Sequence, residues 1–183
     1  DSARGQAEHG GLSAFGQEVV REMNALGMMI DMSHAAESSF YDALALSQAP
    51  IVCSHSSSRA LCSHPRNLTD EQMKALAAQG GVAQVTLYHG FLRHEGEATV
   101  LDALDHLHHM VQVMGPEHVG IGTDFDGDGG VRGLKDASEL IGFTRQLLRR
   151  RYSESDLQGI WGGNFLRVMR QVQSSATSHP GLS

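Results

Sequence analysis

The stretch IVCSHSSSRALCSHPRN, residues 51–67, begins as a short apolar run and then changes to small polar residues and arginines. Pro50 precedes the run, and His55 ends it. A buried strand followed by a polar loop explains this pattern, and so does a strand that carries a functional side chain at its tip. The neighbouring elements decide between these two interpretations.

Helical and extended segments alternate along the chain. Phe15, Val19, Met23 and Leu26 recur at spacings of three and four, which predicts an amphipathic helix. The same reasoning predicts helices over 13–26, 37–47, 69–79, 98–114, 136–151 and 153–172, and strands over 28–34, 50–55, 81–88 and 118–127. Strands that alternate with helices of this length predict an α/β fold with right-handed βαβ units and a parallel sheet.

Composition and charge narrow the class of protein. The chain has 183 residues, 40% of them hydrophobic and 19% charged, which is typical of one folded domain. A net charge of -7 argues against a nucleic-acid partner. Cys53 and Cys62 are too few for a disulfide framework, and no apolar run approaches the roughly 20 residues of a membrane span.

Three of the predicted strands end in the same way. A small hydroxyl residue follows each apolar run, and then comes His34, His55 or Asp124. Because the carboxyl ends of parallel strands meet at one edge, we expect these side chains to lie together. Two imidazoles and a carboxylate suit a zinc-type site and metal-assisted hydrolysis. The alternative is that each histidine only makes a structural hydrogen bond.

Arg66 follows His64 and Pro65 in the loop after His55. Its guanidinium could hold a carboxylate with two parallel hydrogen bonds, or it could form an ion pair that caps the next helix. Residues 124–129 open like a calcium-binding EF-hand loop, but the twelfth position is Lys135 rather than a glutamate, which argues against calcium. His106, His108 and His109 are expected on a partly solvated helix face.

Four blocks of sequence together resemble the membrane (renal) dipeptidase family. They are GLSAFGQEVVREMNALGMMIDMSH (11–34), APIVCSHSSSRALCSHPRN (49–67), HVGIGTDFDG (118–127) and YSESDLQGIWGGNFLRV (152–168). The blocks occur in the family's order, and the resemblance extends from Gly11 to about Val168.

The resemblance implies a (β/α)8 TIM-type barrel with two zinc ions. Such an enzyme hydrolyses dipeptides, including those with a C-terminal D-residue, by a metal-bound hydroxide, and some members open the lactam ring of carbapenems. Carried onto this sequence, His34 and His55 match metal ligands, Arg66 matches the residue that binds the substrate carboxylate, and Asp124 matches the catalytic residue that handles protons.

The sequence also departs from the family pattern. An H-x-D pair, a bridging Glu and a further substrate-contacting His are not found. The chain therefore resembles the C-terminal half of the barrel, about strands five to eight, with a partial barrel domain over 1–172 and a disordered tail over 173–183. We expect the isolated chain to be inactive and marginally stable, because two imidazoles alone hold zinc weakly and a half barrel exposes two sheet edges.

Two other functions stay open. The chain could belong to another metal-dependent amidohydrolase, or it could be a non-catalytic barrel fragment. The expected partners are small dipeptide substrates, with a homodimer left open and no nucleic acid. Family members occur lipid-anchored outside animal cells and as soluble bacterial proteins, and we favour a soluble bacterial enzyme of the cytoplasm or periplasm.

Overall fold

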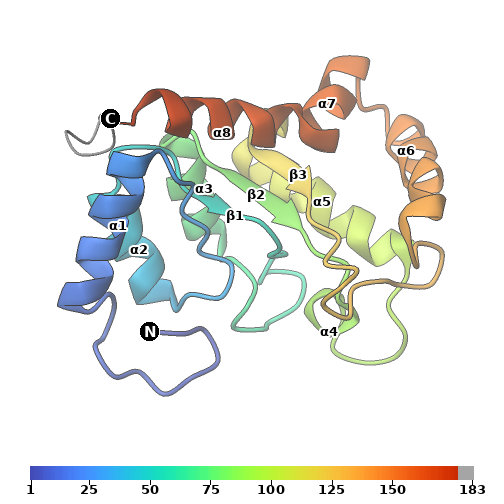
Figure 1. The fold of residues 1–183 in the computed structure, drawn as a ribbon. Helices are drawn as coiled ribbons and strands as arrows, with labels where there is room; N and C mark the ends of the chain where they lie inside the picture. The colour runs from blue at the N-terminus through green and yellow to red at the C-terminus, as the bar shows by residue number, and fades with distance from the viewer. Residues whose placement is uncertain (177–183) are drawn as a thin grey trace.

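A short parallel sheet lies between helices in the computed structural model of the protein, which describes residues 1–176 (Figure 1). The strands are β1 (Val52–Cys53), β2 (Val82–Val85) and β3 (Val119–Ile121). The helices are α1 (Ala14–Leu26), α2 (Glu37–Leu46), α3 (Asp70–Ala78), α4 (His89–Leu92), α5 (Val100–Met114), α6 (Leu140–Arg149), α7 (Glu154–Gln158) and α8 (Asn164–Ser174). Short 3-10 turns η1 (Pro116–His118) and η2 (Ala137–Glu139) and the π-helical turn η3 (Gly159–Gly163) join them. The predicted mixed α/β class is confirmed.

The sheet is parallel and has the order β1-β2-β3. Val52 pairs with Val82, and Ala83 pairs with Val119. The segment predicted as a strand over 28–34 forms no regular strand, but Asp31 bridges Val52 in parallel. Four extended segments therefore run side by side in sequence order, although each strand is shorter than the apolar run that predicted it.

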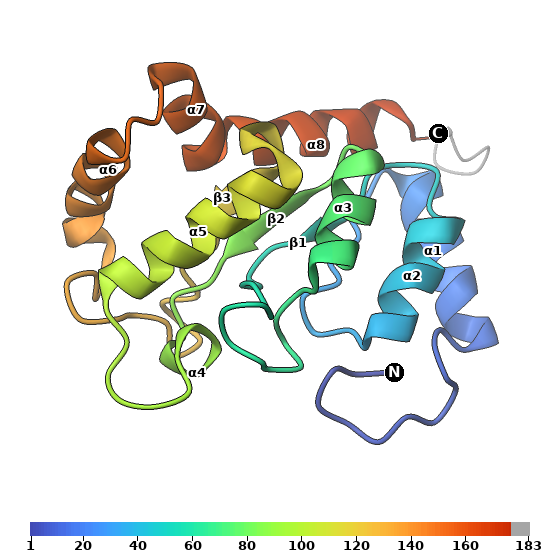
Figure 2. The same ribbon diagram turned by 180° about the vertical axis from the view of Figure 1, so that it is seen from behind.

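The two faces of the sheet pack in different clusters because successive strand residues point to opposite sides. Cys53 and Ala83 belong to the larger core, which also contains the buried α3 and α5 residues Met73, Leu76, Leu104 and Leu107. Figure 2 shows α3 and α5 together on this side of the sheet. Val52 and Val82 instead pack with Val168 and Val172 of α8. The helices cover the two faces of the sheet, and loops follow the carboxyl ends of its strands.

Local signals place most helix ends correctly. Ser13 caps α1, and Gly27 ends it in the left-handed conformation at φ 68. Capping boxes form at Thr69 and Ser153, the residues at which two of the predicted helices begin. Helix α8 ends at Ser174, two residues beyond the predicted 172. Of the predicted tail, residues 177–183 lie outside the described residues. None of the helices in residues 1–176 has the length and apolar character needed to cross a bilayer.

Of the four residues that predicted α1, only Met23 packs against the core. Phe15 is 73% exposed, and Val19 and Leu26 are exposed as well, whereas Val20 and Asn24 are the buried residues of this helix. The buried face is therefore rotated away from the most apolar stripe. An exposed apolar stripe of this kind is unusual for a surface helix.

The expectation for His106 is wrong. Its ring is buried, at 1% exposure, and both nitrogens are used: Nδ1 accepts from the Ser58 amide at 3.0 Å, and Nε2 donates to the Leu92 carbonyl at 3.1 Å. This pairing requires a neutral ring with its proton on Nε2. His106 thus joins α5 to the loop after β1 and to the end of α4.

Asn164 holds the start of β3. Its Nδ2 group donates to the carbonyls of Pro116 at 2.7 Å and Val119 at 2.8 Å. Gly159, at the start of the π-helical turn, has no side chain, and a Cβ there would contact the Asn164 side-chain amide. The π-helical turn between Gly159 and Gly163 therefore brings a buried amide against the one strand whose end carries Asp124.

Replacing Asn164 with Ala should lower the free energy of unfolding by about 1–3 kcal/mol, because two buried carbonyls lose their donor. Urea unfolding measures this difference. The exposed amide Gln158 provides the control, and Gln158→Ala should change the stability by less than about 0.5 kcal/mol. Equal effects of the two substitutions would contradict the role of Asn164.

Acid should destabilise the fold through His106. Burial lowers the pKa of this ring below its ordinary value, so its contribution is complete above pH ~6.5 and is lost as the pH falls through the folded-state pKa. We expect the free energy of unfolding to fall between pH 7.5 and pH 5, and to fall less steeply in His106→Gln. Exposed His9 is the matched position, and His9→Gln should keep the slope of the unmodified chain. An unchanged slope in His106→Gln would contradict this account.

Candidate metal and substrate site

His34 and His55 meet at the carboxyl ends of their segments. Their Nε2 atoms lie 2.9 Å apart, and the two ring planes are tilted by 58°. The segment 30–32 and β1 run in parallel, which brings the two residues that follow them to the same edge. The structure therefore places the two predicted ligand nitrogens at one point.

A carboxylate behind the two histidines joins their segments. Asp31 Oδ1 accepts from the amide of Ser33 at 3.1 Å, the hydroxyl of Ser33 at 2.9 Å and the amide of Ser54 at 3.0 Å. The Ser54 hydroxyl donates to Asp31 Oδ2 and also lies 2.7 Å from Nδ1 of His55. Desolvation alone would raise the pKa of Asp31, but the hydrogen bonds from Ser54 and Ser33 outweigh it and hold the pKa below its usual value.

The loop after His55 is held by one buried amide. Asn67 Nδ2 donates to the carbonyls of Phe91 at 2.7 Å and Cys62 at 2.9 Å, and its Oδ1 accepts from the Ser57 amide at 3.2 Å. Together with His106 this residue fixes the loop against α4 and α5. The rigid loop positions Arg66, which directly precedes Asn67.

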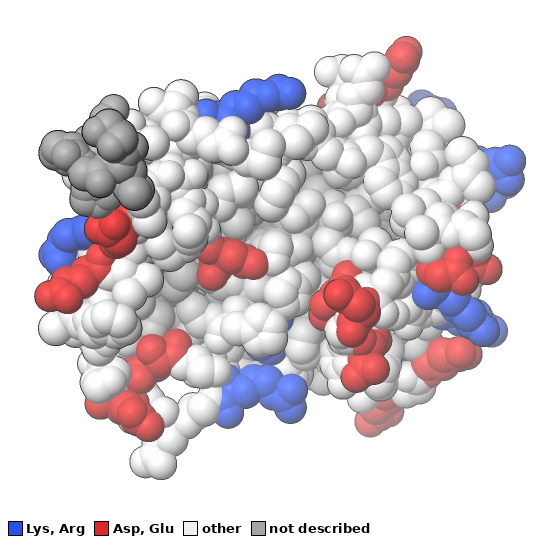
Figure 3. Space-filling model, in the orientation of Figure 1, with Lys and Arg blue, Asp and Glu red and all other residues white. Residues whose placement is uncertain are grey.

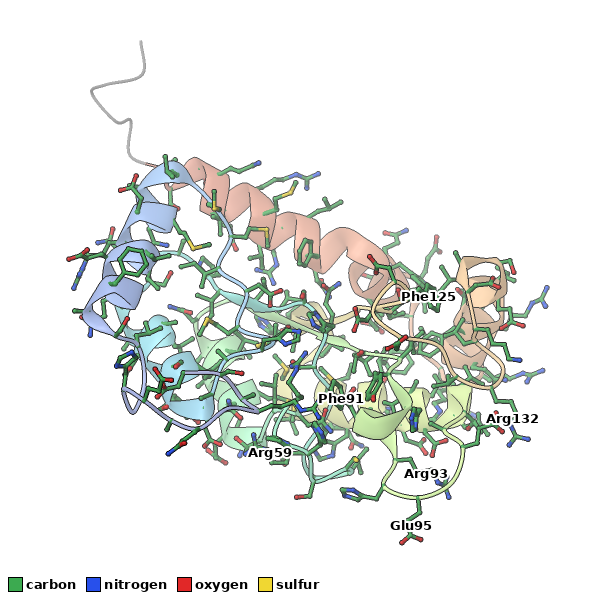
Figure 4. The ribbon with its side chains drawn as sticks, turned by 60° about the horizontal axis from the view of Figure 1, so that its bottom comes forward. Arg59, Phe91, Arg93, Glu95, Phe125 and Arg132 are labelled. Atoms are coloured by element: carbon green, nitrogen blue, oxygen red, sulfur yellow. The ribbon has the colours of Figure 1, made fainter. Side chains whose placement is uncertain are left out.

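Arg66 is buried, at 3% exposure, and its charge is incompletely paired. Nη2 lies 3.5 Å from the His55 carbonyl, and the guanidinium lies over the Phe91 ring, 5.2 Å from its centroid. Nη1 has no hydrogen-bond partner among residues 1–176. The predicted alternative, an ion pair that caps the next helix, is absent from this part of the chain because Thr69 and Gln72 make the α3 capping box. Phe91, which belongs to α4, is labelled in Figure 4.

Asp124 begins the loop after β3 in the left-handed conformation, at φ 57. Two turns fold over it, since its carbonyl accepts from the amides of Gly127 at 2.9 Å and Gly129 at 2.7 Å. Gly122 has to be glycine, because a Cβ there would overlap the carbonyl oxygen of Ser54. The end of β3 thereby comes against the residue that precedes His55. Figure 3 shows acidic side chains over the loop that follows β3.

The four predicted residues form one electrostatic group. Desolvation and the neighbouring charges of Arg66 and His55 lower the pKa of His34. Asp124 opposes this effect. Desolvation also lowers the pKa of Arg66, and Asp124 again acts in the opposite direction. Arginine stays charged through such a shift, so a fixed cation stands beside the histidine pair.

The two histidines suit a metal ion. Two imidazole nitrogens bound to one tetrahedral zinc lie ~3.3 Å apart, given Zn–N bonds of ~2.0–2.1 Å, and the observed 2.9 Å is near this value. Among residues 1–176, however, no group of three or more His, Cys, Asp or Glu side chains is arranged to hold a metal. The described residues therefore bring together two possible metal donors and no third.

Sequence reasoning missed the residues behind the site. Asp31, Ser54 and Asn67 each make several hydrogen bonds that order His55 or Arg66. In the sequence, only their position close to His34, His55 or Arg66 marks them. A cavity of about 420 Å³ lies elsewhere and is lined by Leu92, Arg93 and Asp102 among others.

Comparisons with known proteins agree on one family. The family described as membrane dipeptidase (peptidase family M19) matches residues 1–181. The chain is 43% identical over 174 residues to mouse dipeptidase 3, covering 94% of this chain and 35% of that protein. It is 42% identical over 167 residues to an uncharacterized dipeptidase of Schizosaccharomyces pombe, covering 89% of this chain and 40% of that protein. The chain thus spans less than half the length of these relatives.

Two solved structures have a similar fold. The probable dipeptidase PvdM from Pseudomonas aeruginosa matches with a TM-score of 0.93 and 31% identity, over 96% of this chain and 60% of that one. A metallo peptidase from Rhodobacter sphaeroides, liganded with a phosphinate mimic of the dipeptide L-Ala-D-Ala, matches with a TM-score of 0.84 and 31% identity, over 88% of this chain and 47% of that one.

Arg66 should reduce the stability of the fold. Replacing it with Met removes a buried donor that lacks a partner, so we expect the free energy of unfolding to stay level or rise by about 1 kcal/mol. Arg167, whose guanidinium donates to the Gly80 and Glu117 carbonyls, is the matched control, and Arg167→Met should lower it. Urea unfolding compares the two. A clear loss of stability in Arg66→Met would show that its contacts with His55 and Phe91 dominate.

Proposed function

The chain belongs to the membrane dipeptidase family, peptidase family M19, and from this premise we propose that it forms part of a zinc-dependent dipeptidase. His34 and His55 bind metal, Arg66 binds the free carboxylate of the dipeptide, and Asp124 acts in proton transfer. The reaction is hydrolysis of the single peptide bond between the two residues.

One observation carries this proposal most directly. Arg66 is a buried cation with an unpartnered Nη1 group in the described residues, and it lies beside two convergent imidazoles. A buried donor without a partner costs about 1–3 kcal/mol, so folds retain one where a ligand completes it. The ligand that satisfies a guanidinium fork best is a planar carboxylate. An acid-terminated substrate next to a metal site is what a dipeptidase requires.

The residues of this chain divide the work between binding and proton transfer. A bound metal supplies an activated water and polarises the scissile carbonyl. Arg66 fixes the carboxylate terminus, and this contact sets the distance from the free acid to the bond that is cleaved. The carboxylate of Asp124 takes a proton from the attacking water and returns it to the leaving amine. The guanidinium restricts the enzyme to substrates with a free acid at that distance.

We further propose that the substrates include dipeptides with a C-terminal D-residue. The support is the solved Rhodobacter sphaeroides relative, which holds a phosphinate mimic of L-Ala-D-Ala. Phosphinates resemble the tetrahedral species of peptide hydrolysis. A site anchored mainly through the substrate carboxylate tolerates either configuration at the neighbouring carbon.

We infer that this chain corresponds to the C-terminal half of a (β/α)8 barrel, with residues 1–172 as a partial barrel domain. Supporting features are the exposed apolar stripe of α1, the lack of a further pairing partner beyond Asp31 within residues 1–176, and a solved relative of about twice the matched length. The further ligands for two zinc ions then come from sequence outside these 183 residues. The chain alone is accordingly expected to be inactive.

The test uses L,L and L,D dipeptides and their C-terminal amides. A protein extended upstream of Asp1 should hydrolyse the acids in a chelator-sensitive way and the amides at least ~10²-fold more slowly, because the amide leaves Arg66 unpaired. Arg66→Met should abolish this discrimination, and Arg66→Lys should weaken it because the fork is lost. The 183-residue chain, assayed in parallel, should show no turnover.

Arg93→Met is the matched control for this assay, since Arg93 pairs with Asp102 away from the histidines. It should keep the preference for acids over amides. Equal rates on acids and amides in the unmodified protein would refute the carboxylate role of Arg66. Cleavage of cyclic amides but not dipeptides would assign the protein to another amidohydrolase activity.

A further inference from the structure

We propose that Asp31 is a positioning residue that acts through the Ser54 hydroxyl to hold His55 in the tautomer with its proton on Nδ1, so that Nε2 is free to bind metal. This inference rests on the proposed function, because it explains how one of the two ligands is prepared. Its evidence is a chain of hydrogen bonds from Asp31 through Ser54 to His55.

The direction of these bonds is set at the carboxylate. Asp31 Oδ1 accepts from two backbone amides, those of Ser33 and Ser54, which can only donate. It also accepts from the Ser33 hydroxyl. An ionised carboxylate is an acceptor at both oxygens, so Oδ2 must accept from the Ser54 hydroxyl, its hydrogen-bond partner within residues 1–176.

The hydroxyl of Ser54 carries a single proton, and that proton is used toward Asp31. The contact between Ser54 Oγ and His55 Nδ1, at 2.7 Å, must then have the imidazole as donor. His55 is therefore protonated on Nδ1, and its Nε2 presents a lone pair. Nε2 of His34, 2.9 Å away, supplies the proton of the contact between the rings.

The opposite tautomer is disfavoured by the same geometry. If Ser54 donated to Nδ1, its oxygen would face the carboxylate oxygen of Asp31 with no proton between them. Two electron-rich oxygens at hydrogen-bond distance repel each other. Ser33 stiffens the arrangement, since its hydroxyl also accepts from the backbone amide of His55 at 3.0 Å. The network orders both the ring and the backbone of His55.

The chemistry gives Asp31 a role distinct from metal binding. Partners behind a ligating histidine fix its tautomer, and their loss typically costs 10–100-fold in metal affinity or activity. In Asp31→Asn the amide can keep Oδ1 as acceptor and place its NH2 group toward Ser54. The hydroxyl would then accept from Asn and donate to His55 Nδ1, which reverses the tautomer, as Asn does in place of Asp in a Ser-His-Asp triad.

The tautomer can be read by long-range ¹H–¹⁵N correlation spectra of the chain labelled at histidine, recorded at pH 8, with the His55 signals identified by loss in His55→Asn. We expect the Nδ1–H pattern for His55 in the unmodified chain and the Nε2–H pattern in Asp31→Asn. Ser54→Ala should give a mixture. Zinc affinity, measured by competition with a chromophoric chelator, should fall 10–100-fold in both variants.

Asp42→Asn is the matched control, because Asp42 accepts from the Leu12 amide and is outside this network. It should leave the His55 pattern and the zinc affinity unchanged. A His55 Nε2–H pattern in the unmodified chain would overturn the proposal. An unchanged His55 tautomer in both Asp31→Asn and Ser54→Ala would overturn it as well.

The positioning role of Asp31 and the proposed dipeptidase function can be refuted independently of each other. If the tautomer behaves as expected but the extended protein cleaves no dipeptide, the positioning role stands and the proposed function falls. If dipeptides are cleaved but the tautomer does not depend on Asp31, the function stands and the positioning role falls.

Discussion

The site depends on the hydrogen bonds that the carboxylate of Asp31 accepts. It receives hydrogen bonds from Ser33 and Ser54, which precede the two histidines on neighbouring segments. These segments share no long ladder, because only Asp31 bridges Val52 at this edge. A charged acceptor that collects donors from both sides replaces the missing strand pairing. These bonds act together with the Asp31–Val52 bridge and with the bond from the His55 amide to the Ser33 hydroxyl, and they hold His34 and His55 at a common point.

Stability and ligand binding are opposed in the neighbouring loop. Asn67 and His106 form hydrogen bonds with backbone groups of the loop and hold it in one conformation. The same rigid loop buries Arg66 with an unpartnered nitrogen, and the hydroxyls of Ser56, Ser57 and Ser58 are buried without partners in the described part of the chain as well. These polar atoms without partners all belong to the loop that carries Arg66. The fold is therefore less stable here than it could be, and the proposed substrate carboxylate would supply the missing partner of Arg66.

Sequence patterns predicted the α/β alternation and the convergence of the strand ends, because apolar runs and capping residues are local signals. They failed where burial depends on partners distant in sequence. On α5, Leu104 is buried but Leu101 is exposed, and the buried face also includes Ala103, His106 and Met110. The role of Asn164 depends on carbonyls about 45 residues away in the chain, and that of Asp31 on a serine 23 residues away. No local period encodes such contacts.

The central claim is that His34, His55 and Arg66 form one site, with metal on one side and a carboxylate on the other. A crystal structure of the upstream-extended protein, grown with zinc and a phosphinate dipeptide mimic and measured at the zinc absorption edge, tests it most directly. The account predicts an anomalous peak bonded to Nε2 of both histidines and the mimic's carboxylate paired with the Arg66 guanidinium. A zinc peak away from either histidine, or a carboxylate bound elsewhere while Arg66 stays unpaired, would contradict it.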